Sequence, residues 1–157
     1  MSGLHRIRFR LNGRPVQKHV EARTSTVDMI RHDAGLTGTH VGCEHGVCGA
    51  CSIVLDGAVV RGCLVYAVQL DGAAVETIEG ASDSGRIAAL QAAFVDRNAL
   101  QCGFCTPGML LIAAELLARE PNPSRTQIRE ALSGNICRCT GYEAIVDAVA
   151  AAAKAAS

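Results

Sequence analysis

The chain has 157 residues, of which 49% are apolar, and its 15 Lys and Arg balance 15 Asp and Glu. This neutral charge excludes the strongly basic face that a nucleic-acid-binding protein needs. The sequence has no apolar run long enough to cross a membrane, so neither nucleic acid nor membrane is an expected partner.

Residues 1–80 predict a mostly β domain. Ile7, Phe9 and Leu11 alternate with polar residues before the turn residues Asn12 and Gly13, which indicates a strand with one apolar face. The expected elements are a strand and turn at 5–13, a returning strand at 15–22, a helix at 25–36 that starts at Ser25 or Thr26, a hairpin at 51–62 around Asp56-Gly57, and a strand at 73–80. One helix crossing a small twisted sheet is typical of the β-grasp fold.

Residues 81–157 predict a helical domain. The stretch 81–85, Ala-Ser-Asp-Ser-Gly, is rich in turn residues and is expected to be a linker. The expected helices cover 86–100, 106–120, 124–132 and 140–156, with N-caps at Thr106, Ser124 and Thr140. Four helices indicate a bundle. The predicted class is therefore α+β, with a β-grasp, plant-type ferredoxin-like domain followed by a four-helix-bundle domain.

The eight cysteines divide equally between the two halves. No signal peptide or twin-arginine signal is recognisable, so the chain is predicted to be cytoplasmic, where cysteines are more often metal ligands than disulfides. The first set has a C-x4-C-x2-C spacing with a distant fourth member, which is typical of plant-type [2Fe–2S] ferredoxins. Its members are Cys43, Cys48, Cys51 and Cys63.

The loop that holds this first set also contains Gly42, Gly46 and Gly49. A short loop supplies three thiolates to one compact cluster only by wrapping closely around it. Glycine can adopt positive φ and can bring its backbone N–H close to a sulfur. The three glycines therefore fit a cluster-binding loop.

Two other metal sites compete for the first set. Zinc usually takes its ligands as two separated short-spaced pairs, which this spacing fits less well. A Rieske site would need two histidines, and only the first half of such a motif is present, at Cys43 and His45. His45 is therefore interpreted as a solvated loop residue.

The second set has the pattern C-x2-C followed much later by C-x-C, at Cys102, Cys105, Cys137 and Cys139. Each pair directly precedes a predicted helix, so two helix N-termini are expected to face one negatively charged cluster. Spacing alone leaves zinc open for this set. Tyr142, at the start of the last helix, is interpreted as packing.

Together the two motifs resemble the small iron–sulfur subunit of the molybdenum hydroxylases, the xanthine oxidase family. The segments that carry the resemblance are LTGTHVGCEHGVCGAC (36–51), the distant Cys63, LQCGFCTPGML (100–110) and GNICRCTGY (134–142). The resemblance covers about residues 4–152, and it matches three-subunit bacterial members such as carbon monoxide dehydrogenase and N-heterocycle dehydrogenases.

The resemblance implies two [2Fe–2S] clusters, one in each half, with the two cysteine sets as ligands. It implies a large partner subunit that binds the molybdenum cofactor and a medium one that binds FAD, assembled as a dimer of heterotrimers. Gln101 and Cys139 match the family positions that lie near the pterin. Electrons would pass singly from the molybdopterin through the helical-domain cluster and the β-grasp cluster to FAD, and this chain would make no bond in the substrate.

Three functions are therefore compared. The first is the electron-transfer subunit of a molybdenum hydroxylase complex, and the second is a free-standing two-cluster ferredoxin. Small plant-type ferredoxins are usually acidic, whereas this chain is neutral, which favours the complex. The third is a zinc-stabilised interaction module. The substrate of a complex is chosen in the large subunit and is not predicted by this sequence.

Overall fold

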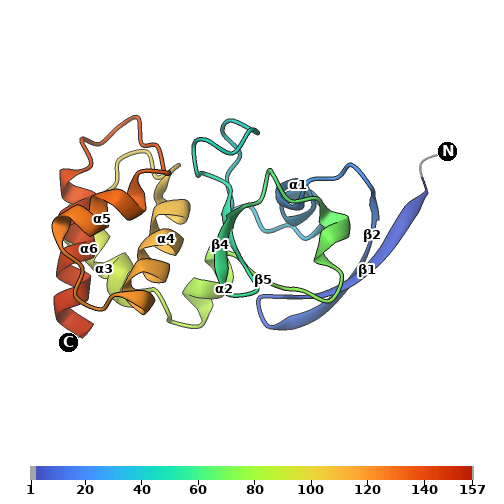
Figure 1. Cartoon of the computed structure of the whole chain (residues 1–157), viewed down its shortest axis with the longest axis horizontal. Helices are drawn as coiled ribbons and strands as arrows, with labels where there is room; N and C mark the ends of the chain where they lie inside the picture. Colours follow the sequence, from blue (N-terminus) through green and yellow to red (C-terminus); the bar gives the residue numbers. More distant parts are fainter. Residues whose placement is uncertain (1–2, 157) are drawn as a thin grey trace.

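The computed structural model describes residues 3–156 and has two halves that lie side by side along its long axis (Figure 1). The N-terminal half is built on a sheet, and the C-terminal half consists of helices. The strands are β1 (Leu4–Leu11), β2 (Arg14–Glu21), β3 (Ser52–Leu55), β4 (Ala58–Arg61) and β5 (Ala74–Glu76).

The five strands form one sheet in the order β2-β1-β5-β3-β4. Only the β1–β5 pair is parallel, and the other neighbours are antiparallel. Ile7, Phe9 and Leu11 point into the core as the alternation predicts, with exposed fractions of 2%, 4% and 7%. Met29 and Ile30, from the helical segment that crosses the sheet, are fully buried in the same apolar cluster. The β-grasp expectation is confirmed.

Several local predictions for this half are corrected. The segment predicted as one helix at 25–36 is a single α-turn, α1 (Thr26–Asp28), followed by the π-helix η1 (Met29–Asp33). Ser25 is its N-cap, because the Ser25 Oγ accepts a hydrogen bond from the Asp28 N–H at 3.1 Å. The strand expected at 73–80 ends at Glu76. The short 3-10 helix η2 (Ala67–Leu70) is not indicated by any pattern in the sequence.

The helical half contains α2 (Ile78–Asp83), α3 (Ala88–Asp96), α4 (Thr106–Arg119), α5 (Arg125–Leu132) and α6 (Glu143–Ala156). Helices α3 to α6 pack around a second apolar cluster whose largest fully buried members include Phe94, Met109 and Ile145. This arrangement confirms the four-helix bundle. The linker prediction for 81–85 is wrong in part, because residues 81–83 complete α2.

Of the three helix starts predicted for the helical half, one is correct and two are wrong. Ser124 forms a capping box with Gln127. Helix α4 already includes Thr106, and Cys105 occupies its N-cap position. The expected box between Thr140 and Glu143 does not form, because the Glu143 carboxylate pairs with two arginines of α5 at 2.7 and 2.9 Å.

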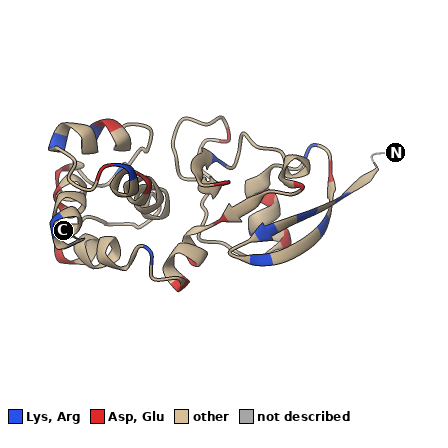
Figure 2. Cartoon of the chain, turned by 60° about the horizontal axis from the view of Figure 1, so that its bottom comes forward, with Lys and Arg blue, Asp and Glu red and all other residues tan. Residues whose placement is uncertain are grey.

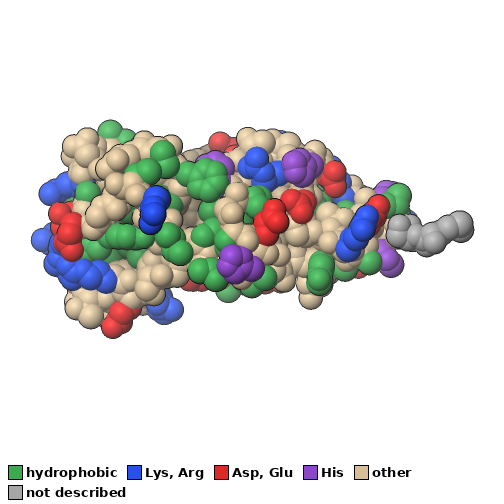
Figure 3. All heavy atoms as spheres, turned by 90° about the horizontal axis from the view of Figure 1, so that it is seen from above, with side chains coloured by type: hydrophobic (Ala, Val, Ile, Leu, Met, Phe, Trp, Pro, Cys, Tyr) green, Lys and Arg blue, Asp and Glu red, His purple; other side chains and the backbone are tan. Residues whose placement is uncertain are grey.

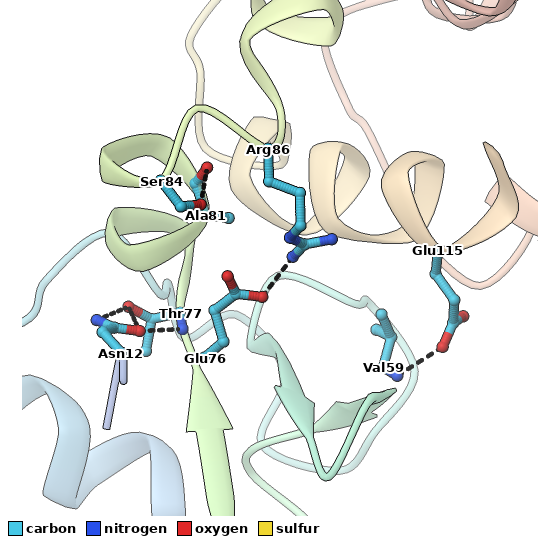
Figure 4. Close-up of polar contacts among 8 residues, drawn as sticks. All are labelled: Asn12, Val59, Glu76, Thr77, Ala81, Ser84, Arg86 and Glu115. Atoms are coloured by element: carbon cyan, nitrogen blue, oxygen red, sulfur yellow. Dashed lines mark hydrogen bonds and ion pairs between the residues drawn. The ribbon is translucent and has the colours of Figure 1, made fainter. Parts of the chain in front are cut away.

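Two polar contacts join the halves near α2 (Figure 4). The Arg86 guanidinium pairs with the Glu76 carboxylate at 2.5 Å. The Glu115 carboxylate, on α4, accepts a hydrogen bond from the Val59 N–H on β4 at 2.7 Å. These contacts hold β4 and β5 against the start of the bundle.

A tighter junction, here called the seam, joins residues 48–49 to residues 108 and 134–136. The Ile136 N–H donates to the Cys48 carbonyl at 2.8 Å. A Cβ on Gly108 would lie 2.4 Å from the Gly49 carbonyl oxygen, and a Cβ on Gly49 would lie 2.3 Å from the Asn135 Oδ1. Gly49 and Gly108 therefore lie too close to the facing backbone and to the Asn135 side chain for either position to hold a side chain.

Both signs of charge are distributed over both halves in the view of Figure 2. No helix among residues 3–156 is both long enough and apolar enough to cross a membrane.

The seam makes the substitution Gly108→Ala informative. In an ordinary helix interior this change would stabilise by up to about 1 kcal/mol. Here the new methyl group would overlap the Gly49 carbonyl oxygen, so we expect a loss of about 1–3 kcal/mol, as for other overpacked sites. Thermal unfolding of the full chain measures the change. Gly141→Ala is the control, because a Cβ there meets nothing within 4 Å, and an equally small change in both variants would contradict the close contact at the seam.

Candidate metal centres

The first four cysteines meet at one end of the sheet. Cys43, Cys48 and Cys51 lie in the irregular loop between η1 and β3, and Cys63 follows β4. The Gly62 N–H donates to the Cys51 carbonyl at 3.0 Å, which brings the fourth cysteine beside the third. Cys51 is 2% exposed, so this end of the site is closed to water.

The loop glycines act as expected at two positions and differently at the third. Gly46 and Gly49 have φ of +85° and +75°, which a side chain would strain. Gly42 does not have positive φ, but a Cβ there would lie 3.0 Å from the Cys48 sulfur. The loop also contains a strained residue that the sequence did not indicate, Glu44, with φ of +58°.

The second four cysteines come from the loops before α4 and α6, as the sequence predicts. Cys105 directly precedes α4, and α6 begins a few residues after Cys139. The Cys102 and Cys139 sulfurs are 3.4 Å apart and both residues are exposed. Cys137 is 9% exposed, so this site has one exposed and one buried end.

All eight cysteines are free thiols, and their sulfurs approach one another in pairs. The pairs are Cys43–Cys48, Cys51–Cys63, Cys102–Cys139 and Cys105–Cys137. Within residues 3–156, no three His, Cys, Asp or Glu side chains converge on the position of a single ion. A [2Fe–2S] cluster takes four thiolates, two at each iron, so two neighbouring pairs per site fit the donor set of such a cluster.

At each site, one thiol has a lowered pKa and another has a pKa raised by burial. The backbone N–H groups of Cys48 and His45 lower the pKa of Cys43 to about 6, while burial raises the pKa of Cys51 to about 11. The backbone at Phe104 lowers the pKa of Cys102, and burial raises that of Cys105 to about 12. Each site therefore has a more accessible end, half-buried in the first site and exposed in the second, and a buried end.

Backbone N–H groups also donate hydrogen bonds to cysteine sulfurs. The Cys48 N–H donates to the Cys43 sulfur, and the Thr140 N–H donates to the Cys137 sulfur, both at 3.3 Å. Hydrogen bonds of this kind stabilise thiolate charge and tune the reduction potential of a bound cluster. His45 is exposed, and its Nδ1 faces the Cys43 carbonyl oxygen at 2.5 Å.

Tyr142 has a role that its sequence position did not indicate. Its hydroxyl accepts a hydrogen bond from the Cys137 N–H at 2.8 Å and donates to the Cys137 carbonyl at 3.1 Å. The residue itself has φ of +66°, a conformation that is rare for a bulky residue. The phenol thus fixes the backbone of one predicted ligand, and the interpretation as simple packing is wrong.

The two sites are joined through their own loops. The seam hydrogen bond between the Ile136 N–H and the Cys48 carbonyl links the residue before Cys137 to a cysteine of the first set. His40 stacks on Phe104 with ring centroids 4.6 Å apart, and its Nδ1 lies 2.7 Å from the Phe104 carbonyl. The cysteine loops of both halves accordingly lie along the same edge of the molecule (Figure 1).

Comparison with known proteins identifies both halves. A family model described as "2Fe-2S iron-sulfur cluster binding domain" matches residues 9–80, and one described as "[2Fe-2S] binding domain" matches residues 77–150. The chain is 54% identical to the nicotine 6-hydroxylase small subunit of Paenarthrobacter nicotinovorans, over 88% of this chain and 84% of that one. The chain belongs to the small iron–sulfur subunits of the xanthine oxidase family of molybdenum hydroxylases.

Other members of this family match over nearly their full length or over one part. The caffeine dehydrogenase subunit gamma of Pseudomonas sp. (strain CBB1) is 47% identical over 92% of this chain and 89% of its own. The crystal structure of quinoline 2-oxidoreductase from Pseudomonas putida 86 superposes with a TM-score of 0.93 at 52% identity, covering 99% of this chain and 97% of that chain. Aldehyde oxidoreductase from Desulfovibrio gigas gives a TM-score of 0.88 at 42% identity, covering 97% of this chain but 17% of that one.

The low pKa of Cys43 predicts unequal thiol reactivity in iron-free protein. A pKa of about 6 leaves Cys43 mostly thiolate at pH 7, whereas Cys51, at about 11, stays protonated. Since the thiolate is the nucleophile, short anaerobic pulses of iodoacetamide should label Cys43 well before Cys51, and labelling of Cys43 should fall as the pH drops below about 6. Mass spectrometry reads the sites, and equal rates at both would contradict the loop geometry.

The two hydrogen bonds between the Tyr142 hydroxyl and the Cys137 backbone predict that Tyr142→Phe is less stable than the unmodified chain. The substitution removes both hydrogen bonds and leaves the Cys137 N–H without its partner, which should cost about 1–3 kcal/mol. Thermal unfolding and amide exchange at Cys137 measure the two effects. Tyr66→Phe is the matched control, because Tyr66 is 54% exposed and lies in the other half. An unchanged rate of amide hydrogen exchange at Cys137 in Tyr142→Phe would contradict the role of these hydrogen bonds.

Proposed function

We propose that the chain holds two [2Fe–2S] clusters, one in each half. The ligands of the first are Cys43, Cys48, Cys51 and Cys63, and those of the second are Cys102, Cys105, Cys137 and Cys139. The observation that carries this proposal is the approach of the eight free thiols in four pairs, two pairs at each site. Thiols in this arrangement match the four thiolates and two irons of each cluster.

The chain transfers electrons within a larger oxidoreductase. Relatives that match over most of their length are named as subunits: the small subunit of nicotine 6-hydroxylase, subunit gamma of caffeine dehydrogenase and the iron-sulfur-binding subunit of xanthine dehydrogenase. This similarity overturns the alternative of a free-standing ferredoxin. The proposed partners are a large molybdopterin-binding subunit and a medium FAD-binding subunit, in a dimer of heterotrimers. We also propose that this complex is cytoplasmic.

Bound clusters supply one-electron chemistry between a two-electron molybdenum site and a flavin. The chain's own residues hold the two sites at a fixed separation, because the seam joins residue 48 to residue 136 by backbone contact. They also exclude water from the buried end of each site, at Cys51 and Cys137. The chain needs no substrate-binding side chain for this work, which supports a non-catalytic role.

The exposed end of the second site is where the large subunit would dock. Gln101, Cys102 and Cys139 are all exposed there, which fits the proposed position of Gln101 and Cys139 beside the pterin. Hydrophobic side chains are exposed over both halves on the face that carries the cysteine loops (Figure 3). Those next to the cysteines include Val47, Leu64, Phe104 and Ile136, with exposed fractions of 45% to 60%. Apolar side chains that gather beside the cysteine loops in this way fit a surface that a partner chain covers.

Chemical analysis and spectroscopy test the proposal. Anaerobically prepared protein should contain two irons and two inorganic sulfides per site, and dithionite reduction should give two distinct rhombic electron paramagnetic resonance (EPR) signals. Cys63→Ser should abolish one signal and Cys102→Ser the other, since each removes one ligand from one site. Each variant is the control for the other. Zinc without iron or sulfide would establish the zinc module instead.

The assembly is tested separately, by gel filtration of the native protein from cells that produce it. The chain should elute with two larger chains, together with molybdenum and FAD. A solitary small species that retains both EPR signals would contradict the complex but leave the clusters in place.

A further inference from the structure

Arg61, the last residue of β4, lies between the two proposed cluster sites. It is two residues before Cys63 in the sequence, and it pairs across the sheet with Ser52, the residue after Cys51. Its Nη1 donates to the Ser52 Oγ at 2.7 Å, and its Nη2 donates to the Gly134 carbonyl at 2.7 Å. The guanidinium thus reaches from the first site into the segment that leads to Cys137.

The surroundings of Arg61 are part-buried and neutral. Ser52 is 1% exposed, and its hydroxyl in turn donates to the Gly49 carbonyl at 2.7 Å. Among residues 3–156, the ion pairs do not include Arg61. The carboxylate that reaches β4 from the helical half, that of Glu115, is hydrogen-bonded to the Val59 N–H. Among the described residues, the Arg61 guanidinium therefore donates to neutral acceptors, the Ser52 hydroxyl and the Gly134 carbonyl.

A part-buried cation without a carboxylate partner is costly unless another negative charge offsets it. Each proposed site would supply such a charge, because four thiolates and two sulfides outweigh the charge of two ferric irons. A one-electron reduction makes each cluster more negative by one unit. A fixed positive charge nearby favours the reduced form, and the effect falls with distance and with the effective dielectric.

We propose that the Arg61 guanidinium is a counter-charge shared by the two clusters and that it raises both of their reduction potentials. The proposal rests on the proposed function, since it needs both clusters to be present. The larger effect is on the first cluster. Arg61 is two residues before the proposed ligand Cys63, and its strand partner Ser52 directly follows the proposed ligand Cys51. The same side chain also ties the two ligand loops together through Ser52 and Gly134, so charge and geometry must be separated by experiment.

The test is a dithionite titration of the anaerobic full chain with its clusters, in which EPR follows each cluster separately. Arg61→Gln removes the charge, and we expect the equilibrium constant for reducing the first cluster to fall by about tenfold, which is about 59 mV for one electron. The second cluster should shift in the same direction by less. Arg61→Lys keeps the charge and should leave both potentials close to those of the unmodified chain. Arg61→Met is a second neutral variant should Arg61→Gln not fold.

The matched control is Arg86→Gln, which also removes an arginine from the contact between the halves, but one paired with Glu76. The reduction potentials of both clusters in Arg86→Gln should equal those of the unmodified chain. Unmoved potentials in Arg61→Gln and Arg61→Met would overturn the proposal, and so would an equal fall in Arg61→Lys, which would assign the effect to the hydrogen bonds. Absence of both EPR signals from the unmodified chain would overturn the proposed function and this proposal together. Two signals with unmoved potentials would overturn this proposal alone.

Discussion

The backbone contact between residues 48–49 and residues 134–136 is the constraint on which the rest of this protein depends. Two apolar cores, one under a sheet and one inside a helical bundle, are joined at the loops that carry their cysteines, and Val54 and Val59 of the sheet also pack against the helical core. Close contact there is possible only because Gly49 and Gly108 have no side chain. A flexible connection would let the two sites drift apart, and the proposed transfer of single electrons between them requires a short and constant separation.

Each cysteine site is built with the same asymmetry, although the two folds are unrelated. One end is more accessible and the other is buried, and a backbone N–H group donates to sulfur at the accessible end of the first site and at the buried end of the second. The buried end provides a low dielectric, which strengthens the electrostatic interactions of nearby charges. The more accessible end leaves cysteine sulfurs within reach of the surface, where the proposed partner subunit can approach. An electron carrier that works between fixed partners needs both properties at once.

The residues around the cysteines divide the work of holding the loops. Tyr142 fixes the backbone of Cys137 from within the bundle, and Arg61 reaches across from the sheet to the same segment. Tyr142 acts through hydrogen bonds alone, whereas Arg61 also adds a positive charge. The apolar face around the loops then remains free for other chains of the complex.

The sequence by itself determined the two cysteine sets, the β-grasp and bundle architecture, and the membership of the family, because thiol spacing and apolar periodicity are local properties of the chain. It also placed Ser124 at a helix start and the positive φ values at Gly46 and Gly49. Tertiary structure alone decided that Glu143 pairs with α5 instead of capping its own helix, that Gly108 must lack a side chain, and that Arg61 and Tyr142 hold the cysteine loops. These contacts join residues far apart in the sequence or depend on where a loop folds back, and no local pattern records them.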